Sequence, residues 1–116
     1  MDISEYLIAK MNQEFHKGYS PQLCCTVLPK LKCVDGFTVS VQCHCGAYCI
    51  PAVEYGLNLP DRYTHIELGY PSSSDSLIAE YAEEPDELTH TVYPYVPVDI
   101  LEQLIEKHGG LVGEKQ

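Results

Sequence analysis

Leu31-Lys32-Cys33-Val34-Asp35-Gly36-Phe37-Thr38-Val39 contains a turn signal between two segments that resemble β-strands. Val34-Asp35-Gly36 suits a three-residue hairpin loop, because glycine readily adopts the left-handed conformation that such a loop requires. This loop opposes Cys33 to Phe37 and keeps the apolar side chains on one face, whereas a two-residue loop would place two lysines among the valines. We therefore expect residues 23–34 and 37–45 to form a hairpin.

The same register predicts the outer pairs of this hairpin, which are Leu31 with Val39, Val27 with Cys43, and Cys25 with Cys45. Pro29 has no N–H to donate to a sheet, so it marks the first strand as an edge strand or as an interrupted one. An edge strand presents unpaired backbone groups, which leaves homodimerisation open.

Two later segments predict further strands. Residues 62–70 alternate, with Ile66 and Leu68 on one face and Tyr63 on the other. Residues 89–96 combine valine and tyrosine around a proline, which is typical of a second edge strand. A turn at residues 71–75 and a short helical piece at residues 76–82 are expected between these strands.

Helical signals lie at both ends of the chain. Asp2 is suited to cap a first helix that ends near Gly18, and a last helix is expected over residues 98–108, with Pro97 in its first turn. Helices at both ends with strands between them favour an α+β fold over a parallel α/β fold. We predict a single domain, residues 1–116, with an antiparallel sheet of four to five strands and an N-terminal and a C-terminal helix packed on it.

Acidic side chains dominate the middle of the chain. Residues 33–106 contain thirteen acidic side chains and one basic one, Arg62, while all six lysines lie outside this segment; the formal charge of the whole chain is −10. A surface of one sign repels nucleic acid and anionic membranes and attracts basic proteins. We therefore expect a basic protein as partner, with no direct nucleic-acid or membrane binding.

The N-terminal residues and the overall hydropathy favour a cytoplasmic protein. No apolar run reaches the length of a membrane span, and the first residues lack the basic and then apolar pattern of a signal peptide. In the cytoplasm, the six cysteines are expected to be reduced thiols or metal ligands.

Cys43-His44-Cys45-Gly46-Ala47-Tyr48-Cys49 is similar to a metal-binding knuckle. Zinc takes four tetrahedral ligands, often thiolates, and the hairpin register adds a cysteine from the opposite strand. The candidate zinc ligands are Cys25, Cys43, Cys45 and Cys49. The run lacks the C-x2-C spacing typical of structural zinc sites, so the pattern favours buried thiols and no cofactor. A zinc site and a Cys25–Cys45 disulfide are the alternatives.

Catalytic motifs are missing from the sequence. It contains no G-x-G-x-x-G, no P-loop and no H-E-x-x-H, and none of its five histidines stands at a spacing from a cysteine that marks a nucleophile with its base. We therefore expect the protein not to be an enzyme.

Three phrases carry a resemblance. They are Tyr63-Thr64-His65-Ile66-Glu67-Leu68-Gly69-Tyr70-Pro71, Thr91-Val92-Tyr93-Pro94-Tyr95-Val96-Pro97 and Ile105-Glu106-Lys107-His108-Gly109-Gly110. Together they resemble a type of small acidic protein encoded by phages and prophages, over roughly residues 27–112. The resemblance implies no catalytic residues. It implies a phage context and the cytoplasm of a host cell, where small acidic proteins include inhibitors of bacterial defence such as anti-CRISPR proteins.

The acidic surface and this context together suggest an inhibitor that occupies a basic groove in place of nucleic acid. B-DNA carries one negative charge per about 1.7 Å of axis, a density that closely spaced carboxylates approach, and tyrosines could anchor the contact. The predicted partner-binding residues are Asp75, Glu80, Glu83, Glu84, Asp86, Glu87, Asp99, Glu102 and Glu106, with Tyr81, Tyr93 and Tyr95. The alternatives are a solvated surface without a binding role and a small zinc-binding structural or accessory phage protein.

Overall fold

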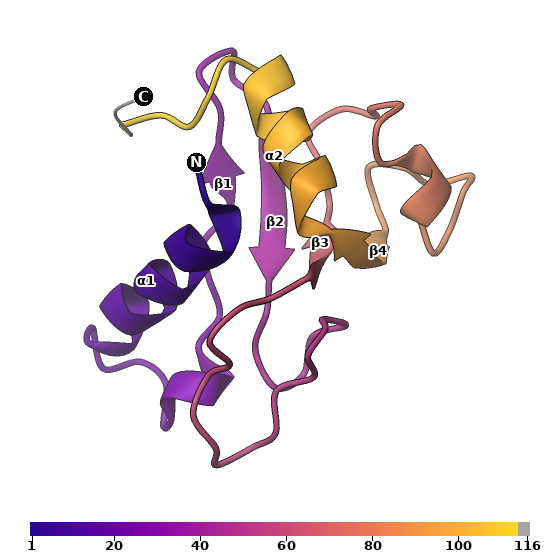
Figure 1. Cartoon of the computed structure of the whole chain (residues 1–116). Coiled ribbons are helices and arrows are strands. Elements are labelled where there is room, and N and C mark those ends of the chain that lie inside the picture. Colours follow the sequence, from indigo (N-terminus) through magenta and orange to yellow (C-terminus); the bar gives the residue numbers. More distant parts are fainter. Residues whose placement is uncertain (114–116) are drawn as a thin grey trace.

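The computed structural model describes residues 1–113 and has the predicted α+β fold, with a four-stranded antiparallel sheet in the order β1-β2-β3-β4 (Figure 1). A helix lies near each end of the chain, and the helical piece predicted at residues 76–82 is a single 3-10 turn. The elements are α1 (Ile3–Phe15), the 3-10 turn η1 (Leu23–Cys25), β1 (Leu31–Lys32), β2 (Thr38–Gln42), β3 (His65–Gly69), the 3-10 turn η2 (Ala79–Tyr81), β4 (Val92–Pro97) and α2 (Val98–Lys107).

The β1–β2 hairpin has the predicted register at its turn. Leu31 lies opposite Val39, and the amide of Cys33 donates to the carbonyl of Phe37 at 2.8 Å. Gly36 adopts a φ of +97°, in the left-handed region that the three-residue loop requires. The turn chemistry therefore determines how these two strands align.

Beyond the turn, the predicted hairpin ends early. Val27 is 62% exposed, whereas Cys43 is fully buried, so the predicted pairing of these two residues is wrong. The side chain of Gln42 substitutes for the missing ladder: its oxygen accepts from the amide of Leu28 at 3.0 Å, and its nitrogen donates to the Leu28 carbonyl at 2.8 Å. Pro29 cannot donate to a ladder, and the chain before it turns into η1.

The two edges of the sheet differ. Residues 110–112 lie along β1, where Leu111 forms an antiparallel bridge with Cys33 and the amide of Val112 donates to the carbonyl of Lys32 at 2.9 Å. β4 forms the other edge, as predicted, and it is irregular: its pairing with β3 shifts register, and Tyr95 has a φ of +55°. One edge is therefore covered and the other is bent.

The N-terminus of α1 is held by two carboxylates. Asp2 accepts a hydrogen bond from the amide of Glu5 at 3.1 Å, as predicted, and Glu102 of α2 accepts one from the amide of Ile3 at 3.0 Å. Negative charge at a helix N-terminus is stabilising, because the first amides have no partner within the helix. Figure 1 shows α2 crossing the sheet with α1 beside it, and Glu102 links the two helices.

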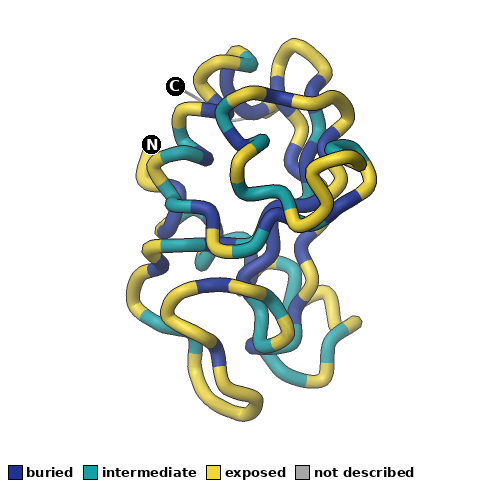
Figure 2. The backbone as a smooth tube through the Cα atoms, turned by 90° about the vertical axis from the view of Figure 1, so that its right-hand side faces the viewer, coloured by how far each residue is buried: buried dark blue, intermediate teal, exposed yellow. Residues whose placement is uncertain are grey.

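The core lies between the helices and the sheet, and buried stretches recur along the chain in Figure 2. Tyr63 is 1% exposed although the alternation predicted it on the face opposite Ile66, which is also buried. Tyr63 precedes β3, so strand alternation does not extend to it. Its hydroxyl donates to the carbonyl of Cys43 at 2.8 Å, and its amide donates to the hydroxyl of Ser4 at 2.7 Å.

Replacing Gln42 with leucine is expected to destabilise the protein by about 2 kcal/mol, because the buried amide and carbonyl of Leu28 lose their partners. Urea denaturation measures this change. The matched control is Gln103→Leu on the exposed side of α2, which is expected to cost less than about 0.5 kcal/mol. Equal effects of the two substitutions would contradict this role for Gln42.

Candidate functional site

Five of the predicted partner-binding acids lie on or beside the loop between η2 and β4. Glu80, Glu83, Glu84, Asp86 and Glu87 are all exposed. We call these five residues the acidic loop. The ring of His90 lies 4.0 Å from the carboxylate of Glu87. The salt bridges of Lys17, Arg62 and Lys107 go to carboxylates elsewhere, so those cations do not neutralise the acidic loop.

Backbone hydrogen bonds fix the acidic loop on the edge strand. The amide of Glu83 donates to the carbonyl of Val92 at 3.0 Å, and the amide of Glu84 donates to the hydroxyl of Thr91 at 3.1 Å. The hydroxyl of Tyr93 donates to the carbonyl of Leu88. Because these bonds hold both ends of the loop, its carboxylates are presented from an ordered backbone.

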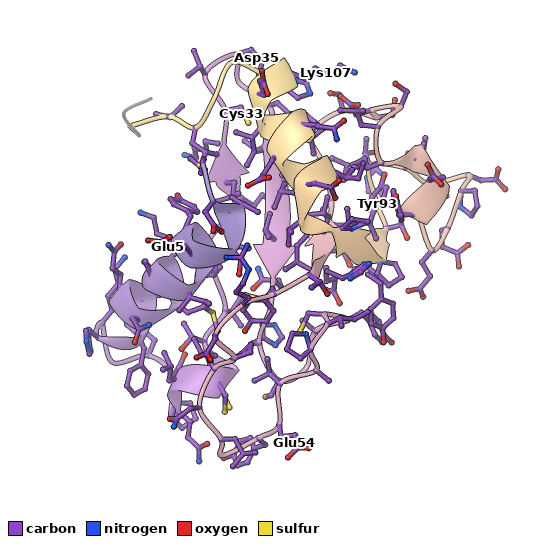
Figure 3. All side chains as sticks on the ribbon, in the orientation of Figure 1. Glu5, Cys33, Asp35, Glu54, Tyr93 and Lys107 are labelled. Atoms are coloured by element: carbon purple, nitrogen blue, oxygen red, sulfur yellow. The ribbon has the colours of Figure 1, made fainter. Side chains whose placement is uncertain are left out.

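Two predicted partner-binding residues are not at the surface. Asp75 is 7% exposed and Tyr93 is fully buried, so the prediction that they contact a partner is wrong. Tyr93, a residue of β4 that is labelled in Figure 3, supports the acidic loop from inside. Tyr81 is half-buried next to the loop. Tyr95 is exposed, with its ring 5.7 Å from the ring of Tyr48.

The acids of α2 belong to a different part of the surface. Asp99 and Glu106 are exposed, whereas Glu102 is half-buried through its bond to α1. Glu102 and Glu106 border a hollow that Met1 and Gly109 also line. Lys107 and His108 contact Asp75 instead. The structure therefore does not gather all of the predicted acids into one group.

Asp75 is the buried centre of a charge network. Its carboxylate binds the ammonium of Lys107 at 3.1 Å and Nε2 of His108 at 2.9 Å, and Nδ1 of His108 lies 2.6 Å from the carboxylate of Asp35. Figure 3 shows Lys107 and Asp35 together at the C-terminal end of α2. Phe37 stacks on the His108 ring at a centroid distance of 4.0 Å. The network joins α2 to the hairpin loop and to the segment before η2.

This network shifts the pKa values of its members. Burial opposes the charged forms of His108 and Asp75, but hydrogen bonds outweigh it. Bonds to Asp35 and Asp75 raise the pKa of His108, while bonds from the Leu77 amide, His108 and Lys107 lower the pKa of Asp75. The pKa of Asp35 is lowered by the Phe37 amide and then by His108.

These shifts predict how stability depends on pH. The contribution of His108 is complete below about pH 6.5, the ordinary value, and is lost as the pH rises through the raised pKa. The contributions of the two aspartates are present above roughly pH 4 and are lost as the pH falls through their lowered pKa values. We expect the unfolding free energy to decline from pH 6 to about pH 7.5, below the range in which the cysteines of the unfolded chain ionise, and we expect this decline to be lost in His108→Gln, as measured by urea denaturation.

The control for this prediction is His16→Gln, which replaces an exposed histidine after α1. It should keep the decline of the wild-type protein. An unchanged decline in His108→Gln would show that another group titrates.

The structure brings three sulfur atoms together near η1. The sulfur of Cys25 lies 3.9 Å from that of Cys24 and 3.8 Å from that of Cys45, and all three lie within 4.8 Å of one another. We call Cys24, Cys25 and Cys45 the sulfur cluster. All three thiols are free, because these separations are far longer than a disulfide bond of about 2.05 Å.

The sulfur cluster differs from the predicted zinc ligands. Cys25 and Cys45 are close together, although they do not form the predicted strand pair, and Cys43 and Cys49 are not part of the group. Cys43 is fully buried in the core, and the thiol of Cys49 is 3.6 Å from the carbonyl of Pro51. The prediction missed Cys24, because strand alternation would turn it away from Cys25. Its place in a 3-10 turn removes that alternation, and the tandem Cys24-Cys25 pair was the available signal.

Four of the six thiols are held in their protonated form. Burial, and then hydrogen bonds with Cys45 and Cys24, raise the pKa of Cys25 to about 11. Burial raises the pKa of Cys43 to about 12 against a hydrogen bond from Tyr63, and it also raises the pKa values of Cys33 and Cys49. These four residues therefore carry no thiolate at neutral pH, the form that a nucleophile requires.

Comparison of the chain with protein-family models, with curated proteins and with solved structures finds no significant match. Within residues 1–113, neither helix has the length and apolar character needed to cross a membrane.

Proposed function

We propose that the protein is a non-enzymatic inhibitor that occupies the basic, nucleic-acid-binding groove of a host defence protein, with a CRISPR effector as the first candidate. The observation that carries this proposal is the acidic loop. It presents five exposed carboxylates from a backbone fixed to the edge strand. A lysine- and arginine-lined groove that binds phosphates offers the complementary charge.

The fixed backbone favours binding. A loop that is already ordered loses less conformational freedom when a partner binds to it. Less of the favourable contact energy is then offset by the entropic cost of ordering the loop. The wider negative charge of the chain, −10 in total, would also accelerate encounter with a basic partner. The acidic loop is therefore suited to act as a rigid contact and not as a flexible tail.

One exposed aromatic side chain lies on the strand to which the acidic loop is fixed. Tyr95 follows the loop-binding residues of β4, is 47% exposed and packs against Tyr48. Aromatic side chains supply much of the binding energy at protein interfaces. We include Tyr95 in the proposed contact, with the half-buried Tyr81 at its border.

The phage resemblance of residues 63–71, 91–97 and 105–110 supplies the biological context of the proposal. A phage-encoded inhibitor would act in the cytoplasm of the host cell. There it would compete with nucleic acid for the groove and would not bind nucleic acid itself.

Reversing three charges of the acidic loop tests the proposal. Glu83, Glu84 and Asp86 replaced together by lysine should weaken binding to a purified CRISPR effector, and inhibition of its DNA binding, by about tenfold or more. Binding of the wild-type protein should weaken strongly between low and high salt, because exposed charges are screened. Titration of effector–DNA complexes at both salt concentrations measures both effects.

The matched control reverses three exposed acids elsewhere, Glu5, Glu54 and Asp61, and so changes the net charge equally. Glu54 lies at the end of the molecule opposite Lys107 in Figure 3. The control should retain most of the inhibition. An equal loss in the two variants would reduce the effect to net charge, and the absence of any effector binding by the wild-type protein would refute the proposal.

A further inference from the structure

Three thiols from two separate segments converge at the end of the molecule that is opposite the C-terminus of α2 (Figure 1). Cys24 and Cys25 come from η1, and Cys45 comes from the segment after β2. We propose that the sulfur cluster binds one thiophilic d10 metal ion, Zn²⁺ or Cu⁺, through these three sulfurs. This site is independent of the acidic loop and of the inhibitory function.

The distances suit such an ion. A Zn–S bond is about 2.3 Å long, which places the sulfurs of a tetrahedral site about 3.8 Å apart. Two of the sulfur–sulfur distances are 3.8 and 3.9 Å, and the third is at most 4.8 Å. An ion therefore fits among the three sulfurs with side-chain adjustments of about 1 Å or less. Thiolates are also the ligands that select Zn²⁺ and Cu⁺.

The backbone holds the ligands in place without a metal. The amide of Cys45 donates to the carbonyl of Cys24 at 2.8 Å, which ties the two segments together directly at the cluster. The amides of Cys25 and Thr26 close the η1 turn on Gln22 and Leu23 at 3.0 and 3.1 Å. Binding then requires little ordering of the chain.

A backbone amide also supports the innermost sulfur. The amide of Gly56 donates to the sulfur of Cys24 at 3.3 Å, and such a bond stabilises a thiolate, as bonds from surrounding groups do at metal sites. Gly56 has a φ of +86°, a conformation that glycine adopts at little cost. On metal binding, each coordinating thiol releases its proton to solvent, and the Cys24 thiol gives up its present acceptor, the Gln22 side-chain oxygen at 3.5 Å.

The site has an open side. Cys24 is buried, whereas Cys25 and Cys45 are partly exposed. The three sulfurs would therefore cover the side of the ion that faces the protein and leave the side that faces solvent open. In the described part of the chain, the group contains three metal-ligating side chains. Zn²⁺ would therefore take a water molecule as its fourth ligand, whereas Cu⁺ is satisfied by three thiolates. Closed structural zinc sites have four protein ligands, so this site belongs to the open kind.

Metal titration of the reduced protein tests the inference. Zn²⁺ added in competition with a chromophoric chelator should bind at one ion per chain, and Co²⁺ should give thiolate-to-metal charge-transfer absorption. Cys25→Ser and Cys45→Ser should each weaken Zn²⁺ binding by about tenfold or more, as loss of one of three ligands requires. Cys49→Ala, a matched change outside the cluster, should bind as the wild-type protein does.

A second measurement needs no variant and so does not depend on folding of the mutants. Without metal, the partly exposed Cys45 should react with an alkylating reagent, and one equivalent of Zn²⁺ or Cu⁺ should protect it, as located by peptide mass spectrometry. Binding of Cu⁺ alone would assign a three-coordinate site. Failure of both ions to bind while all six thiols are reduced would overturn the inference. So would loss of Zn²⁺ from Cys49→Ala with retention in Cys45→Ser.

Discussion

The buried carboxylate of Asp75 makes the contacts that hold together α2, the hairpin loop and the segment before η2. It binds Lys107 and His108 at the end of α2, and His108 continues to Asp35 in the hairpin loop. Three segments far apart in the sequence are therefore held by one ion-pair network whose central carboxylate is buried. A buried carboxylate is tolerated only when such partners compensate its lost hydration. The carbonyl of Asp75 also accepts hydrogen bonds from the amides of Ile78 and Ala79, where the chain enters η2.

The Asp75 network also affects how charge is arranged on the surface of the protein. Lys107 directly follows the acidic segment of residues 33–106, and its ammonium binds Asp75. The carboxylates of the acidic loop consequently face solvent without a lysine or arginine from the network. The sulfur cluster lies near η1, at the other end of the molecule (Figure 1). The two proposed sites share no residue, and each is built on its own set of backbone hydrogen bonds.

Local signals in the sequence predicted the elements whose determinants are local. The Asp2 cap, the Gly36 turn and the edge position of the β4 strand were recognised because neighbouring residues specify them. The burial of Asp75 was missed because its partners are 32 and 33 residues away. The Cys24 contribution was missed for a related reason: a 3-10 turn and the Cys45 segment meet only in three dimensions. The sequence showed where the acidic residues are concentrated along the chain, but it did not show which of them are exposed and which are buried.

The C-terminal segment that lies along β1 has a consequence for the behaviour of the protein at high concentration. Residues 110–112 occupy backbone groups that an edge strand would otherwise offer to a second molecule. At the opposite edge, Pro94 and the left-handed Tyr95 interrupt the regular pattern of donors and acceptors. Neither edge of the sheet is a straight template for the addition of another strand. The fold therefore limits amyloid-like growth, although the sheet is small and the core is rich in β-branched residues.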